Sequence, residues 1–209
     1  MRMRLHPLLL PFFLFLIVTG GIAMYALLFV SLLFHETGHL AAARSVGMRV
    51  RSCTIMPYGG ELIIPDRQLA PKRDRLLVAL GGPMATALLL LLVSVIPFPG
   101  QADMIFIQQA LLLLNLLPIL PLDGGQALCA LLEKEGNRYR VRSFFLLHSI
   151  FLLVVGSMLL ASFLPQSLPY LLLSAFLLFQ NISAFRFRKY GRAYEQLKKH
   201  GKNIGERNE

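Results

Sequence analysis

Residues 8–43 read LLLPFFLFLIVTGGIAMYALLFVSLLFHETGHLAAA, and this stretch decides which kind of fold the chain can adopt. It contains a single formally charged side chain, Glu36. As one helix it would be about 54 Å long, whereas the hydrocarbon core of a bilayer is about 30 Å thick. The Thr19-Gly20-Gly21 break therefore predicts two consecutive membrane spans, of which the first is retained rather than removed as a signal peptide.

The rest of the chain has the same character. Of its 209 residues, 56% are hydrophobic and 15% are charged, whereas soluble domains carry about 25% charged residues. Long unbroken apolar runs favour helices over a transmembrane barrel, whose strands alternate in polarity. Further runs lie at about 75–97, 104–132, 144–163 and 168–185. The sequence therefore predicts an all-α polytopic membrane protein with six transmembrane helices.

The positive charges support this count. The 21 lysines and arginines lie in the N-terminus, around residues 44–75, in the 133–143 loop and in the C-terminal tail. With six spans, all these segments face one side, and the positive-inside rule makes that side cytoplasmic, together with both termini. Topology thus explains the net charge of +10 better than nucleic-acid binding, and we expect no nucleic-acid partner. The basic tail suits anionic lipid headgroups.

Two segments differ from the spans. Residues 48–64 are too polar to cross the bilayer and contain the turn sequence Pro57-Tyr58-Gly59-Gly60, so they predict a short membrane-associated β-hairpin after the second span. We expect residues 1–190 to form the six-span core and residues 191–209 to form a basic cytoplasmic tail.

The second span carries a motif with chemical content. His35, Glu36 and His39 form an H-E-x-x-H pattern, in which residues i and i+4 share one helix face and both imidazoles can reach one zinc ion. The glutamate is then placed to act as a base beside the metal. The alternative interpretation, three interfacial polar residues, does not account for the metal-binding spacing. Ionisable groups within membrane helices are functional candidates.

A catalytic zinc ion needs a further protein ligand. Asp123 is the other acidic residue inside an apolar run, and prolines and glycines interrupt the helix around it. Irregular backbone at membrane depth is tolerated where it is buried in protein or lines a wet cavity. A zinc ligand is therefore one interpretation of Asp123, and an interfacial residue of a proline-kinked helix is the other.

The motifs resemble those of the site-2 protease family of intramembrane zinc metalloproteases. The resemblance rests mainly on Phe34–His39 and on Asn115–Gly125, and extends to Met56–Gly60 and Ala79–Pro83. It is strongest to the branch of endospore-forming bacteria that processes a sigma-factor precursor. The resemblance implies that Zn²⁺ is held by His35, His39 and Asp123, that Glu36 is the catalytic base, and that the substrate is bound by Asn115, Pro118 and Pro121.

The resemblance also implies a function. We expect a zinc metalloendopeptidase of the bacterial cell membrane, or of a forespore membrane, that cleaves a membrane-associated protein near the cytoplasmic face. A sigma-factor precursor of sporulation is the expected substrate, and membrane inhibitory subunits are expected partners. Two alternatives stay open. One is a site-2-type protease of another pathway, acting on an anti-sigma factor or a signal-peptide remnant, and the other is a non-proteolytic metal-binding membrane protein.

Overall fold

The computed structural model describes residues 2–5, 22–56, 59–65, 67, 70–134 and 137–205. The predicted first span, from residue 8 to the break at Thr19, lies outside these ranges. Contacts divide the chain into two units, Met1–Leu117 and Pro118–Glu209, and each is taken by itself. The predicted boundary near residue 190 falls within a continuous helix.

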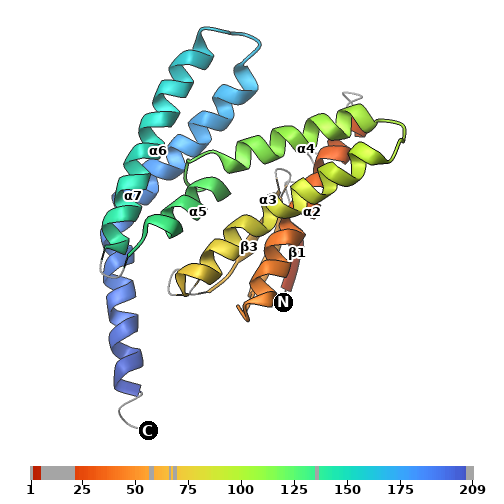
Figure 1. Ribbon diagram of the computed structural model, residues 1–209. Helices are drawn as coiled ribbons and strands as arrows, with labels where there is room; N and C mark the ends of the chain where they lie inside the picture. The colour runs from red at the N-terminus through yellow and green to blue at the C-terminus, as the bar shows by residue number, and fades with distance from the viewer. Residues whose placement is uncertain are drawn as a thin grey trace. The chain divides into compact units, whose positions relative to one another are not determined.

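The first unit contains long apolar helices (Figure 1). Their bounds are Ile22–Ser45 for α2, Lys72–Val95 for α3 and Gln101–Leu116 for α4. Helix α3 packs on both α2 and α4. Helix α3 therefore lies beside α2, the helix that carries the H-E-x-x-H motif, and its residues contact the two histidines.

Helices α2 and α3 cross at two glycines. A Cβ atom on Gly38 would overlap the carbonyl oxygen of Gly81 and would lie 2.6 Å from the Cβ of Ala85. A Cβ atom on Gly81 would lie 2.6 Å from the carbonyl oxygen of Gly38 and 2.8 Å from the Cβ of Ala42. Small residues let membrane helices approach closely, and the crossing point lies within the H-E-x-x-H segment itself.

Short strands complete this unit. They are β1 (Arg2–Leu5), β2 (Ser52–Met56) and β3 (Gly59–Ile63). Strands β2 and β3 pair antiparallel within the segment 48–64, and β1 adds in parallel to the other side of β2. The sequence did not predict β1, because its partner lies about fifty residues away. Association of these strands with the membrane remains a prediction.

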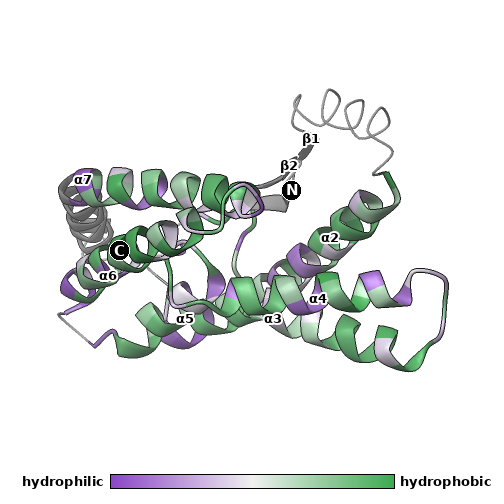
Figure 2. Ribbon diagram, turned by 90° about the horizontal axis from the view of Figure 1, so that it is seen from above, coloured by the Kyte–Doolittle hydropathy of each residue, from purple (hydrophilic) through white to green (hydrophobic). Residues whose placement is uncertain are grey.

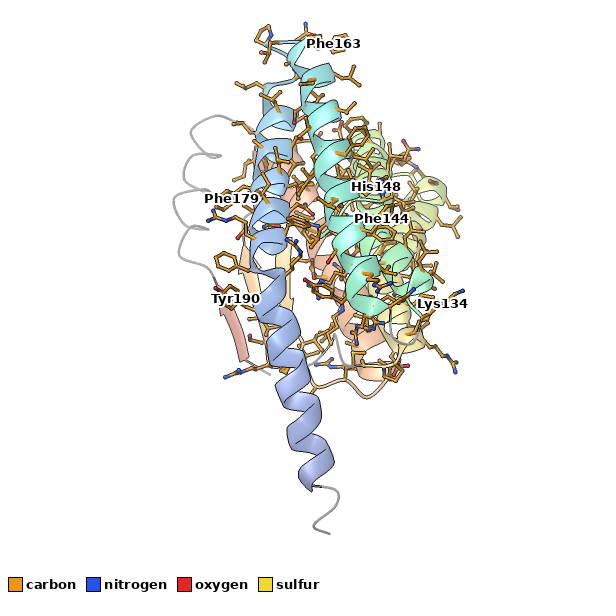
Figure 3. The ribbon with its side chains drawn as sticks, turned by 90° about the vertical axis from the view of Figure 1, so that its left-hand side faces the viewer. Lys134, Phe144, His148, Phe163, Phe179 and Tyr190 are labelled. Carbon is orange, nitrogen blue, oxygen red and sulfur yellow. The ribbon has the colours of Figure 1, made fainter. Side chains whose placement is uncertain are left out.

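The second unit is built on a pair of long helices. Helices α5 (Asp123–Leu132) and α6 (Arg138–Ala161) precede α7 (Leu168–Gly205), and α6 packs along α7 (Figure 3). The apolar run predicted as one span, 104–132, is two helices, since α4 ends at Leu116 and α5 begins at Asp123. The interruption lies at the prolines and glycines that the sequence singled out.

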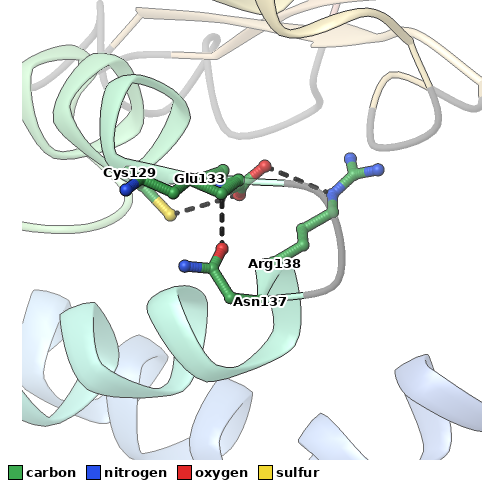
Figure 4. Close-up of polar contacts among 5 residues, drawn as sticks. Cys129, Glu133, Asn137 and Arg138 are labelled. Carbon is green, nitrogen blue, oxygen red and sulfur yellow. Dashed lines mark hydrogen bonds and ion pairs between the residues drawn. The ribbon is translucent and has the colours of Figure 1, made fainter.

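A polar cluster closes the turn between α5 and α6 (Figure 4). Glu133 is buried, and one of its carboxylate oxygens lies 3.4 Å from Nε of Arg138. The backbone N–H of Lys134 donates to Oδ1 of Asn137 at 2.7 Å. The ion pair and the hydrogen bond join the end of α5 to the start of α6.

Four helices of the described residues are long and apolar enough to cross a membrane: Ile22–Ser45, Lys72–Val95, Arg138–Ala161 and Tyr170–Arg188. Apolar residues dominate their ribbons (Figure 2). Large apolar side chains are widely exposed, among them Phe179 (72%) and Met158 (70%), as expected for surfaces that face lipid rather than water. The fold is that of a helical integral membrane protein.

Candidate metal centre

The two histidines of α2 converge. His35 and His39 are 3% and 8% exposed, and their Nε2 atoms are 3.1 Å apart. Two nitrogen ligands at 2.0–2.1 Å from a tetrahedral zinc ion are about 3.3 Å apart. The one-turn spacing thus brings both rings to the separation that a shared zinc ion requires, as the sequence predicted.

The opposite nitrogen of each ring is held by α3. Nδ1 of His35 lies 2.8 Å from Oγ1 of Thr86, and Nδ1 of His39 lies 2.7 Å from the carbonyl oxygen of Val78. The backbone N–H of Gly82 also points at Nδ1 of His39, at 3.2 Å, so α3 offers this ring nitrogen both a hydrogen-bond acceptor and a donor. Neighbouring groups at the second ring nitrogen commonly orient metal-binding histidines.

Gly82 lies opposite both imidazoles. A Cβ atom built there would overlap Nε2 of His35 and of His39, and would lie 2.7 Å from Cε1 of His35. The volume next to the two Nε2 atoms is thus available to an ion because Gly82 has no side chain.

Asp123 is the first residue of α5 and is 7% exposed. The N-terminus of a helix favours a negatively charged group, so a carboxylate is a suitable side chain at this position. His35, His39 and Asp123 are all buried, and each offers one atom that a metal ion could bind. Because Asp123 belongs to the second unit, its role as a ligand is argued below as a proposal.

The other predicted site residues lie on α2, on α4 and in the segment between α4 and α5. Glu36 follows His35 on α2 and is half-buried. Asn115 lies in the last turn of α4, where its Nδ2 donates to the carbonyl oxygen of Leu111 at 3.0 Å. Pro118 is half-buried and Pro121 is exposed, both in the interruption between α4 and α5.

Sequence reasoning missed three neighbours of the histidines: Val78, Gly82 and Thr86. They recur every four residues and so share one face of α3. Thr86 is fully buried, and a hydroxyl in the middle of an apolar run was the available signal. Val78 left no signal, because it acts through its backbone.

The sequence of this chain is similar to those of several known proteins. Residues 23–103 match the model of peptidase family M50. Stage IV sporulation protein FB of Bacillus subtilis is 30% identical over 141 residues, which cover 65% of this chain and 49% of that protein. A zinc metalloprotease of Methanocaldococcus jannaschii is 29% identical over 145 residues, which cover 60% of this chain and 42% of that protein. The chain thus spans about half or less of these curated relatives.

The solved structure of a site-2 protease from Methanocaldococcus jannaschii is similar, with a TM-score of 0.62 and 25% identity over 88% of this chain and 90% of that one. The chain is thus similar to a protein named a zinc metalloprotease and has a fold like that of a site-2 protease. Over residues 23–103 it resembles peptidase family M50, as its motifs indicated.

Proposed function

We propose that the chain is an intramembrane zinc endopeptidase. One observation carries this proposal: two buried imidazoles direct their Nε2 atoms at a volume that Gly82 leaves open, inside apolar helices. Nitrogen ligands with partnered Nδ1 atoms suit zinc. The M50 relatives, one of which is named a zinc metalloprotease, support the same reading.

Each site residue has a distinct proposed role. His35, His39 and Asp123 hold the ion, which leaves a fourth position open, as in catalytic zinc sites. Zinc, when bound, supplies a Lewis acid that polarises the scissile carbonyl. Glu36 accepts a proton from the attacking water and returns it to the amine nitrogen as the C–N bond breaks. No other protein group needs to change its protonation state.

We propose that the substrate is a membrane-associated protein cut near the cytoplasmic face. Asn115 lies just before the interruption between α4 and α5, and Pro118 and Pro121 lie within it, so an extended substrate could bind to irregular backbone there. A sigma-factor precursor of sporulation is the proposed natural substrate, supported by the similarity to stage IV sporulation protein FB. Membrane inhibitory subunits would regulate the site.

The proposed topology has six spans and both termini in the cytoplasm. It is supported by the charges, since the loop residues 97–103 contain no lysine or arginine while every basic residue lies on the opposite side in this arrangement. A cysteine introduced at exposed Ala102 should react with a membrane-impermeant thiol reagent from outside intact cells. Labelling of Ala102→Cys only after the membrane is opened would reverse the orientation.

The central test uses the purified full chain in detergent. Glu36→Gln should keep one equivalent of zinc and lose cleavage of a co-expressed precursor, whereas Asp123→Ala should also bind zinc more weakly. Asp103→Asn, at an exposed acid of α4, should match the wild type in both assays.

Two results would count against the enzyme. Cleavage by Glu36→Gln at the wild-type rate would remove the proposed base. Stoichiometric zinc in the wild type, with no cleavage of any membrane-associated precursor, would instead favour a non-proteolytic metal-binding protein. Cleavage of an anti-sigma factor or a signal-peptide remnant, and not of the sigma-factor precursor, would keep the enzyme and change the pathway.

A further inference from the structure

The segment just before Asp123 is not helical, and its backbone polar groups still need partners inside the protein. For Leu120, these hydrogen-bond partners are side chains of other helices. Its backbone N–H donates to Oγ of Ser149 at 2.8 Å, and its carbonyl oxygen accepts from Nδ2 of Asn181 at 2.5 Å. Both polar groups of one residue are therefore bound by side chains, one from α6 and one from α7.

These side chains are themselves fixed. Ser149 is 0% exposed and also donates through Oγ to the carbonyl oxygen of Phe145 at 2.7 Å. Asn181 is 1% exposed, and its Nδ2 also donates to the carbonyl oxygen of Leu177 at 2.9 Å. Because both acceptors of the asparagine amide are carbonyl oxygens, the amide must present its nitrogen to them. Each side chain thus links Leu120 to its own helix in a single orientation.

Packing holds the same segment from other directions. Ile119 is buried against Leu153 of α6 and Leu177 of α7. A Cβ atom on Gly125 would lie 2.5 Å from the carbonyl carbon of Ile119 and 2.8 Å from the backbone nitrogen of Leu120. The first turn of α5 therefore rests directly on this backbone.

We propose that Ser149 and Asn181 are positioning residues for Asp123. They bind the backbone three residues before the carboxylate, so α6 and α7 fix the start of α5. The inference rests on the proposed function, in which Asp123 is a zinc ligand. In this role neither side chain is a metal ligand, and the effect of both passes through Leu120.

The chain offers a matched control. Oγ of Ser157 lies 2.7 Å from Oγ of Ser174 and donates to the carbonyl oxygen of Leu153 at 2.7 Å. This pair joins α6 to α7 in the same way, and among the described residues its hydrogen bonds go to Leu153 and to each other. Ser157→Ala therefore removes a comparable hydroxyl from the same helix pair without touching the segment before Asp123.

The test measures zinc affinity of the full chain in detergent by competition with a chromogenic chelator. Ser149→Ala and Asn181→Leu should each lower the affinity by about 10–100-fold, the usual effect of removing a group that orients a metal ligand. Ser157→Ala should leave it unchanged, and Ser149→Thr, which keeps the hydroxyl, should restore most of it. Amide hydrogen exchange in residues 119–123 should become at least about tenfold faster in Ser149→Ala. Exchange in α6, the helix that carries Ser149, should not change.

The outcomes separate this inference from the proposed function. If Asp123→Ala binds zinc weakly while Ser149→Ala and Asn181→Leu bind it normally, the positioning role is wrong and the proposed ligand stands. If Asp123→Ala also binds zinc normally, the proposed ligand is wrong. An equal loss of affinity in Ser157→Ala would show that general packing of the helix pair, and not the hold on Leu120, controls the metal.

Discussion

At the scale of single residues, Gly82 controls the volume next to the paired histidines. We expect Gly82→Ala to abolish stoichiometric zinc binding, because the added methyl group would occupy the space beside both Nε2 atoms. Zinc content of the purified variant, measured by atomic absorption, checks this. Full occupancy would show that the ion lies elsewhere.

Gly156 of α6 is the control for that substitution. A Cβ atom there meets no other atom within 4 Å. Gly156→Ala should retain zinc and should stabilise the helix by up to about 1 kcal/mol, from the difference in helix propensity. The two variants add the same methyl group to a membrane helix, so a difference in zinc content reports on the site alone.

Thr86 orients His35 through Nδ1. Thr86→Val keeps the shape of the side chain and removes the acceptor, so we expect zinc affinity to fall by about 10–100-fold. Thr86→Ser, which keeps the hydroxyl, should bind zinc as the wild type does. Equal affinities of the valine and serine variants, measured by chelator competition, would contradict the orienting role.

The sequence predicted that His35 and His39 lie side by side because their spacing is local, one turn of a single helix, and the structure places their Nε2 atoms 3.1 Å apart. That they bind zinc remains a prediction. It could not predict Thr86, Gly82 or the carbonyl oxygen of Val78, because their role depends on how α3 packs against α2. Such packing depends on the fit of two helices and is not encoded in either one alone. The roles of Asp123 and Glu36 remain predictions until the zinc and cleavage assays are done.

At the scale of elements, the crossing of α2 and α3 depends on the closeness of Gly38 and Gly81. Gly81→Ala should push the helices apart and cost about 1–3 kcal/mol in the free energy of unfolding, as overpacking does in other interiors. Leu88→Ala, on the same helix at a side chain that is 53% exposed, should cost less. Unfolding in mixed detergent micelles, followed by circular dichroism, compares the two, and an equal or smaller cost for Gly81→Ala would contradict the close crossing.

Elements were predicted best where hydropathy alone defines them, as in α2, α3, α6 and α7. The run from 104 to 132 was predicted as one span whose helix is interrupted by prolines and glycines around Asp123. It is two helices, and in the segment between them the backbone polar groups of Leu120 are bound by Ser149 and Asn181, which the sequence did not predict. Strand β1 was missed for a related reason, since its partner β2 is distant in sequence.

At the scale of the whole molecule, zinc should act as a stabilising ligand. An ion that binds only the folded chain adds about 2.7 kcal/mol when its free concentration is a hundredfold above Kd. We expect zinc to raise the melting temperature of the metal-free wild type and to raise that of Asp123→Ala less at equal free zinc. Scanning fluorimetry with buffered zinc checks this, and identical shifts in the two proteins would contradict a role for the aspartate.

The class of the whole molecule followed from composition. Too few charged residues and long apolar runs leave a helical membrane protein as the physical solution, and the apolar helices and the similarity to a site-2 protease agree with it. The full number of spans and the orientation remain predictions, because the first predicted span lies outside the described residues and charge bias is the argument for sidedness.

The hydrogen bond from His39 to the carbonyl oxygen of Val78 has a consequence for mutagenesis. A contact made by the main chain survives every exchange of the side chain at that position, so an alanine scan of α3 would score Val78 as a packing residue only. Another apolar side chain at position 78 would leave the bond in place. Replacing the peptide bond after Val78 with an ester weakens the carbonyl oxygen of Val78 as an acceptor. This change would test whether zinc binding depends on that oxygen, which no side-chain substitution at position 78 can do.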